Sequence, residues 1–131
     1  MERRVINPWT WQDQFGYVQA LEVTGSERTL YCAGQTSSDA DGNPVHAGDM
    51  RAQVRQAIDN LETVLREAGF ELSQVVRLNT YTTDVDAFLE ASQEAGARLA
   101  EAGCRPTATL LGVARLAFPE FLVELEATAV A

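Results

Sequence analysis

Cysteine, histidine and proline are scarce in this sequence, and each scarcity excludes a class of protein. Its 131 residues include two cysteines, one histidine and four prolines. Two cysteines close at most one disulfide, and with a single histidine they form no familiar metal-binding spacing. The prolines are scattered, so no proline-rich linker divides the chain. We therefore expect reduced thiols, no metal ion, and one domain over residues 1–131.

Long apolar runs and basic residues are also lacking. The longest apolar stretches span only a few residues, whereas a bilayer crossing needs roughly 20. The amino terminus has two arginines but no apolar core behind them, so it does not resemble a secretory signal. Ten basic against nineteen acidic side chains give a net charge of −9, which repels nucleic-acid phosphates and anionic lipids. We expect a cytoplasmic protein with neither a membrane nor a nucleic acid as its partner.

The chain does contain enough apolar material for one core, at 46% hydrophobic and 22% charged residues. Alternation and β-branching predict strands, and apolar residues at intervals of three and four predict two helices. The segment 37–49, dense in Asp, Gly, Asn and Pro, predicts a surface loop. The expected strands are 17–23, 29–34, 72–82, 107–116 and 121–130; the helices are 50–68, capped by Asp49 and ended by Gly69, and a second from Thr83 or Asp84 to Gly103.

This order of elements predicts an α+β domain with two amphipathic helices on one face of a mixed sheet. The turn at 25–28 predicts a hairpin between the first two strands. Segment 107–116 is apolar on both faces, which is typical of a strand inside a sheet. Because the sheet face without helices still needs covering, we expect a closed homo-oligomer.

Six segments between Gly16 and the carboxyl terminus carry a further signal in their order and spacing. They are GYVQA (16–20), AGQ (33–35), DMRAQVRQAIDNLETVLREAG (49–69), NTYTTDVDAF (79–88), RPTATLLGVARL (105–116) and VELEATAV (123–130). No single segment is specific, but the six together resemble the RidA proteins, also called the YjgF/YER057c/UK114 family.

The resemblance implies a chorismate-mutase-like fold with a mixed six-stranded sheet and two helices on one face. It also implies a homotrimer with a central barrel and small-molecule clefts between subunits. The best-known members hydrolyse reactive imines or enamines to 2-keto acids and ammonia without a cofactor. In those members, an arginine two residues after a strand-opening proline binds the substrate carboxylate, a bidentate task that suits a guanidinium.

This chain departs from the family at that arginine. Two residues after Pro106 stands Ala108, and Leu110 replaces a cysteine that is common in the family. Arg105 and Arg115 are near in sequence, but neither aligns with the arginine, and Arg105 should point to the opposite side of a regular strand from Ala108. The sequence therefore predicts a pocket that is less polar and that binds uncharged or apolar ligands better than amino-acid-derived imines.

Several other residues match cleft positions of the family. Glu124, the predicted catalytic residue, would orient or deprotonate an attacking water. Ligand-binding candidates are Tyr17, the backbone around Ala33 and Gly34, Ser92 near a helix start, and the positions Ala108 and Leu110.

Each candidate has a structural alternative. Glu124 and Glu126 share a strand face, and either could simply be solvated there, which is the favoured interpretation for Glu126. Tyr17 could belong to the core, Gly34 to a bulge, and Ser92 to the surface. Trp9 and Trp11 either cover the mouth of a cleft or pack on the sheet.

Two functions remain open from the sequence. The first is a RidA-like hydrolase acting on an imine, enamine or related carbonyl metabolite that lacks an α-carboxylate. The second is a non-catalytic small-molecule-binding or protein-interaction module on the same trimer scaffold. A ribonuclease, an activity sometimes attributed to this family, is disfavoured because a chain with a net charge of −9 offers little phosphate-binding surface.

Overall fold

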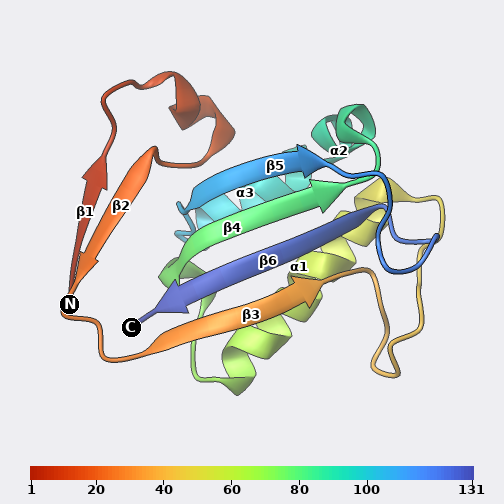
Figure 1. Cartoon of the computed structure of the whole chain (residues 1–131), viewed down its shortest axis with the longest axis horizontal. Coiled ribbons are helices and arrows are strands. Elements are labelled where there is room, and N and C mark those ends of the chain that lie inside the picture. Colours follow the sequence, from red (N-terminus) through yellow and green to blue (C-terminus); the bar gives the residue numbers. More distant parts are fainter.

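A four-stranded sheet with three helices on one of its faces forms the larger part of the structure, a computed structural model that describes residues 1–131 (Figure 1). Its strands are β3 (Thr29–Gln35), β4 (Val75–Thr82), β5 (Thr107–Gly112) and β6 (Val123–Val130), in the order β3-β6-β4-β5. The β4–β5 pair is parallel and the other pairs are antiparallel. The predicted α+β fold with a mixed sheet is therefore confirmed.

The longest helix, α1 (Met50–Glu67), packs its apolar stripe on the sheet. The Asp49 carboxylate caps it by accepting a hydrogen bond from the Ala52 N–H at 3.1 Å, and Gly69 follows its end at φ +76°, a conformation that favours glycine. Ile58, Leu61 and Leu65 are its largest fully buried side chains. Its predicted start, end and buried face are all confirmed. No helix combines the length and the apolar character that a membrane crossing requires.

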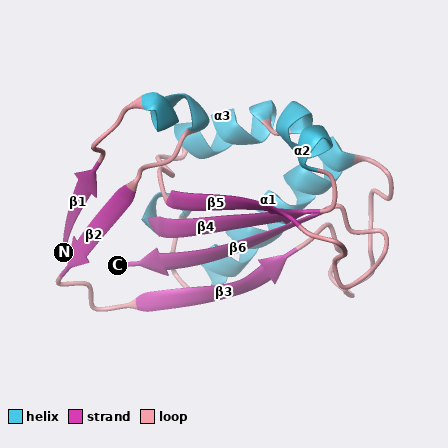
Figure 2. Ribbon diagram, turned by 45° about the horizontal axis from the view of Figure 1, so that its top comes forward, coloured by secondary structure: helices cyan, strands magenta, loops and turns pink.

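The second predicted helix is divided into α2 (Val85–Ala91) and α3 (Gln93–Glu101). The break falls at Ser92, whose hydroxyl donates to the Leu89 carbonyl at 3.2 Å, a local bond that competes with continuation of the helix. Of the two predicted caps, Asp84 is the one used, since its carboxylate accepts from the Ala87 N–H at 3.0 Å. All three helices lie on the same side of the sheet, and its other face is open (Figure 2).

The predicted hairpin between the first two strands is wrong. Strand β2 (Ala20–Thr24) pairs instead with β1 (Glu2–Ile6), which the sequence analysis missed, in a separate two-stranded sheet beside the larger one (Figure 1). The reason is packing: β3 pairs with β6 because this brings Leu30 and Cys32 over the core beside Ala129 and Ala127. The six strands therefore form two sheets, not one.

Two further boundaries differ from the sequence analysis. The residues 72–74 form a short 3-10 helix before β4 and do not belong to the strand. Strand β5 ends at Gly112 and lies at the edge of the sheet, whereas segment 107–116 was expected inside it. The loop at 37–49 is confirmed, with one isolated bridge between Ser38 and Pro44.

Candidate functional site

Glu124 lies against the backbone of Gly34 on the open face of the sheet. Its neighbours Val123 and Leu125 are buried in the core, so the alternation of β6 directs Glu124 away from the helices. A Cβ atom built on Gly34 would stand 2.6 Å from both Cδ and Oε2 of Glu124, closer than real side chains approach. A side chain at position 34 would therefore force this carboxylate to move.

Gly34 belongs to a β-bulge in β3. Cys32 pairs with Ala127 and Gln35 pairs with Leu125, so Ala33 and Gly34 together stand opposite the single residue Glu126, and Glu124 reaches Gly34 from two residues further along the same face of β6. A bulge re-aims the local backbone and frees groups from the regular ladder. The structure thus brings together three of the predicted site residues, Ala33, Gly34 and Glu124.

The second carboxylate of this face, Glu126, is held by two side chains of β4. Its Oε1 accepts from Asn79 Nδ2 at 3.1 Å and from the Tyr81 hydroxyl at 2.8 Å. The hydrogen bonds from Asn79 and then Tyr81 lower the pKa of Glu126, and the bond to Glu126 raises the pKa of Tyr81. Glu124 has no hydrogen bond or ion pair, so the two carboxylates differ: one is fixed and one is free.

Ala108 and Leu110 lie on the other side of the sheet. In the parallel β4–β5 pair, Ala108 stands beside Leu78 and Leu110 beside Thr80, and both of these β4 residues are buried on the side that faces the helices. Thr109, between them, points to the open face, where its hydroxyl accepts from the guanidinium of Arg77 at 2.7 Å. Within one chain, the predicted arginine slot therefore does not meet Glu124.

Tyr17 lies near the start of β5. The N–H of the next residue, Val18, donates to the Pro106 carbonyl at 3.0 Å, and the Tyr17 ring meets that of Trp11 edge to face at 6.3 Å between centroids. Ser92 lies at the α2–α3 junction in the helix layer. The candidates thus divide: Ala33, Gly34 and Glu124 meet on the open face, whereas Ala108 and Leu110 lie on the helix side of β5, Tyr17 near the start of that strand and Ser92 in the helix layer.

Neither nearby arginine occupies the empty slot within the chain. The Arg105 guanidinium lies 3.5 Å from the Asp13 carboxylate. Arg115 forms no ion pair and donates from Nε to the Leu116 carbonyl at 3.3 Å. It lines a shallow hollow of ≈ 310 Å³ at the end of the sheet, together with Thr83, Ala114, Leu116, Phe118, Pro119 and Phe121.

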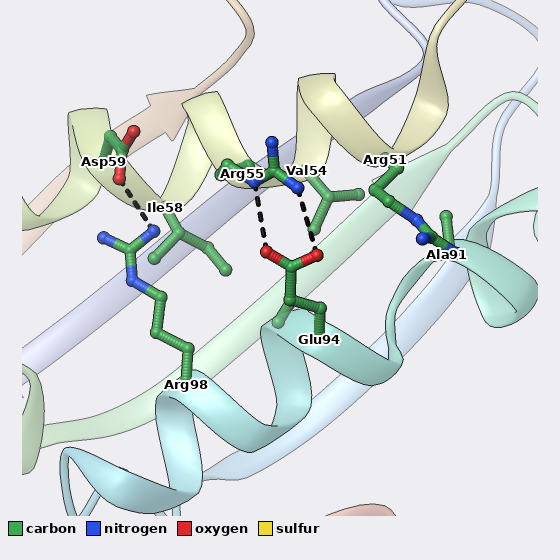
Figure 3. Close-up of a pocket in the computed structure, with 9 residues that line it drawn as sticks. Arg51, Val54, Arg55, Ile58, Asp59, Ala91, Glu94 and Arg98 are labelled. Atoms are coloured by element: carbon green, nitrogen blue, oxygen red, sulfur yellow. Dashed lines mark hydrogen bonds and ion pairs between the residues drawn. The ribbon is translucent and has the colours of Figure 1, made fainter.

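A second hollow, of ≈ 160 Å³, lies between α1 and α3 (Figure 3). Arg55 donates to Glu94 at 3.2 and 3.0 Å, and Arg98 contacts Asp59 at 2.7 Å, so two of the three arginines that line it are paired with acids, and Arg51 lines it without an ion pair. The hollow is a seam closed by ion pairs and is a weaker candidate than the Glu124 face.

The sequence analysis missed Asn79 and Tyr81 as partners of Glu126. The pattern that could have revealed them is the alternation of β4, which places Arg77, Asn79 and Tyr81 on one face and buried residues on the other. Only the pairing of β4 with β6, which is not encoded locally, brings them beside the glutamates.

Comparison with known proteins places this geometry in a family. The sequence model described as Endoribonuclease L-PSP matches residues 12–131. The crystal structure of a Rid-family protein of unknown function from Yersinia pestis, YyfB, is 40% identical, with a TM-score of 0.87 and complete coverage of both chains. Escherichia coli TdcF with bound serine is 25% identical, with a TM-score of 0.70 over 88% of this chain and 87% of that one.

A human relative carries an enzyme name. The human 2-iminobutanoate/2-iminopropanoate deaminase is 30% identical over 87 residues, which are 66% of this chain and 61% of the human protein. The matched family model covers nearly the whole chain, and the fold agrees with the Yersinia pestis structure over the full length of both chains. The chain belongs to the Endoribonuclease L-PSP family, the group also known as RidA or YjgF/YER057c/UK114.

Proposed function

We propose that this chain forms a homotrimer whose inter-subunit clefts hydrolyse a reactive imine, enamine or related carbonyl metabolite without a cofactor. For an imine, water adds to the carbon of the C=N bond, and the carbinolamine then expels ammonia and leaves a carbonyl group. Glu124 accepts one proton from the attacking water and passes it to the nitrogen, which gives the carbinolamine. It then accepts the hydroxyl proton of the carbinolamine and passes it to the departing nitrogen, so ammonia leaves, the carbonyl group forms and no net proton is consumed. The free carboxylate of Glu124 on the Gly34 backbone is the observation that carries the proposal.

The separation of Glu124 from Ala108 supports a site shared between chains. Glu124 lies on the open face, and Ala108 lies on the helix side of the edge strand β5. The open face also exposes 80% of Tyr31, and a large exposed ring on an uncovered sheet face is typical of a surface that another subunit covers.

Ala108 supports a substrate without an α-carboxylate. A charged hydrogen bond contributes about 1.5–3 kcal/mol, so loss of even one from a carboxylate clamp weakens binding by roughly tenfold or more. The relatives named for 2-imino acids or seen with serine have ligands that carry this carboxylate. This chain represents a branch in which the arginine is absent and the ligand is neutral at that end.

The same Ala108 favours a second candidate, a non-catalytic small-molecule-binding or interaction module on the trimer scaffold. In that case the cleft binds a ligand but Glu124 transfers no proton. Turnover distinguishes the two candidates, because a binding module releases no ammonia from any imine.

The experiment measures ammonia release from pairs of imines that differ only in the α-carboxylate, such as those of 2-oxobutanoate and butanone. The account predicts faster turnover of the neutral imine and loss of turnover in Glu124→Gln with the fold retained. Ala108→Arg should shift the preference toward the 2-imino acid. Efficient hydrolysis of the 2-imino acid by the unaltered protein would refute the substrate class, and activity retained in Glu124→Gln would refute the mechanism.

A further inference from the structure

Three large aromatic side chains are exposed in the segment between β1 and β2. Trp9, Trp11 and Phe15 expose 57, 55 and 64% of their surface. Of these three, Trp11 differs from Trp9 and Phe15 because its ring meets a second ring, that of Tyr17, edge to face at an interplanar angle of 76°. The two rings form a corner in which the indole is exposed and the phenol ring is half-buried. A partly exposed aromatic corner of this kind is a surface on which a flat apolar molecule can stack.

Partly buried hydrogen bonds hold the segment that carries this corner. Gln12, fully buried beside Trp11, accepts from Gln19 Nε2 at 3.2 Å, and the Gln19 N–H donates to Asn7 Oδ1 at 2.8 Å. Gly16 turns the chain back at φ +76° before Tyr17. The rings are therefore fixed before any ligand arrives, which lowers the entropy cost of binding.

The corner adjoins the slot at position 108. The Val18–Pro106 backbone bond and the Asp13–Arg105 ion pair join its segment to the start of β5. Ala108 follows Pro106 by two residues, so both side chains point to the same side of the strand, about 6–7 Å apart along it. The corner and the empty slot thus lie on neighbouring parts of one surface.

The charges of this surface do not favour an anion. Arg105, the cation nearest in sequence to the slot, is paired with Asp13, and the slot residues Ala108 and Leu110 are aliphatic. A ligand here meets two ring faces, an aliphatic surface and one phenol hydroxyl. It meets no free positive charge that would compensate the desolvation of a carboxylate.

We propose that Trp11 and Tyr17 determine specificity by selecting ligands with an aromatic or similarly flat unsaturated ring and no carboxylate. The inference rests on the proposed function for the position of the cleft, and it extends that function by naming the substrate class. Trp11 acts by stacking on the ring, and Tyr17 both stacks and offers its hydroxyl to the carbonyl or imine end of the ligand.

The test measures binding of three stable carbonyl compounds to the full-length protein by titration calorimetry. Phenylacetone has a ring and no charge, butanone lacks the ring, and phenylpyruvate adds the carboxylate. Phenylacetone should bind at least tenfold tighter than either of the others. Trp11→Leu should remove most of the advantage of phenylacetone over butanone, Trp11→Phe should restore part of it, and Trp9→Leu, a change at an equally exposed indole, should leave it intact.

Equal binding of phenylacetone and butanone, or equal effects of Trp9→Leu and Trp11→Leu, would overturn the inference. The inference would also be overturned if acrylamide failed to quench the fluorescence of Trp11 in the native protein and quenched it only after the subunits dissociate. Another copy of the chain would then cover the ring. The proposed function fails separately: ring-dependent binding without ammonia release from the phenylacetone imine contradicts hydrolysis and leaves the specificity of the corner standing. Hydrolysis of aliphatic imines that is insensitive to Trp11→Leu supports the proposed hydrolysis and contradicts the role of the corner in specificity.

Discussion

The Glu124 carboxylate occupies the space that a side chain at position 34 would need: a Cβ on Gly34 would lie 2.6 Å from Oε2. A bulge in one strand and an alternating carboxylate in its neighbour create this fit. The backbone groups of Ala33 and Gly34 therefore lie next to a carboxylate that has no hydrogen-bond partner within the chain. A small ligand at this point would meet both.

Gly34→Ala should displace Glu124 with little effect on stability. The backbone of Gly34 is not in the left-handed region, and the group that must move is the end of a flexible side chain. We expect a loss of about 0.5–1.5 kcal/mol in the free energy of unfolding, the cost of an off-rotamer side chain. Turnover should fall on the order of 100-fold, because a 1 Å displacement of a reacting group has an effect of that size. Chemical denaturation and ammonia release measure the two effects.

Gly96→Ala is the matched control. Gly96 lies within α3, and a Cβ there would meet nothing within 4 Å. Alanine should raise the free energy of unfolding by about 0.5–1 kcal/mol, since glycine is a poor helix former. Turnover should not change. Loss of turnover in both variants would show that the effect at position 34 is not specific to Glu124.

Gln53 should be among the most sensitive polar residues of the structure. It is 1% exposed, and its side chain donates to the Glu120 carbonyl at 2.8 Å and accepts from the Leu122 N–H at 2.8 Å, tying the start of β6 to α1. Gln53→Leu keeps most of the volume but leaves both backbone groups unpaired. We expect a loss of roughly 2–6 kcal/mol, at about 1–3 kcal/mol for each of the two unpaired groups. A loss under 0.5 kcal/mol in urea unfolding would contradict this assignment.

Acid should weaken the Glu126 network. Hydrogen bonds from Asn79 and Tyr81 place the folded-state pKa of Glu126 below its ordinary value of 4.5. The stabilisation is therefore complete above about pH 4.5, and it is lost as the pH falls through the folded-state pKa. Tyr81→Phe should raise the Glu126 pKa toward 4.5, as read from the side-chain carbonyl shift in an NMR titration. An unchanged pKa would mean that the Tyr81 hydroxyl does not hold this carboxylate.

Both cysteines should resist thiol reagents in the folded protein. Cys32 and Cys104 are buried, and burial raises both pKa values, that of Cys104 to about 11. The thiolate is the reactive form, so labelling by Ellman's reagent at pH 8 should follow global unfolding. Because the folded-state pKa is raised, the contribution of Cys104 to stability is complete below pH 9, its ordinary pKa, and is lost as the pH rises through 11. Rapid labelling of the native protein would contradict the burial.

The elements that the sequence predicted are those whose signals are local. Helix α1 carries its own cap, apolar stripe and terminating glycine, so residues 49–69 specify it completely. Strand β1 has no such signal: its sequence ERRVI is largely exposed on both faces, and only pairing with β2 makes it a strand. The false hairpin has the same cause. The turn at Gly25 is real, but the partner of β3 is chosen by burial beside β6, far along the chain.

The candidate site also combines features that local sequence predicts with features that it does not. Glu124 and Gly34 were predicted as site residues from their positions in motifs, but their contact depends on a bulge that no spacing predicts. The partners of Glu126 depend on the register of β4 against β6. The separation of Ala108 from Glu124 follows from the register of an edge strand, whose sequence suggested a central one.

Subunit complementation tests most directly whether the site is shared between chains. Glu124→Gln disables one half, and Ala108→Trp fills the other; each variant alone should be inactive while retaining the native circular dichroism spectrum and oligomeric mass. If the two halves come from different subunits, co-refolded equimolar mixtures should recover about a quarter of the wild-type ammonia release, the fraction of interfaces that pair two intact halves. Mixed oligomers that remain inactive while the wild type turns over would contradict the account.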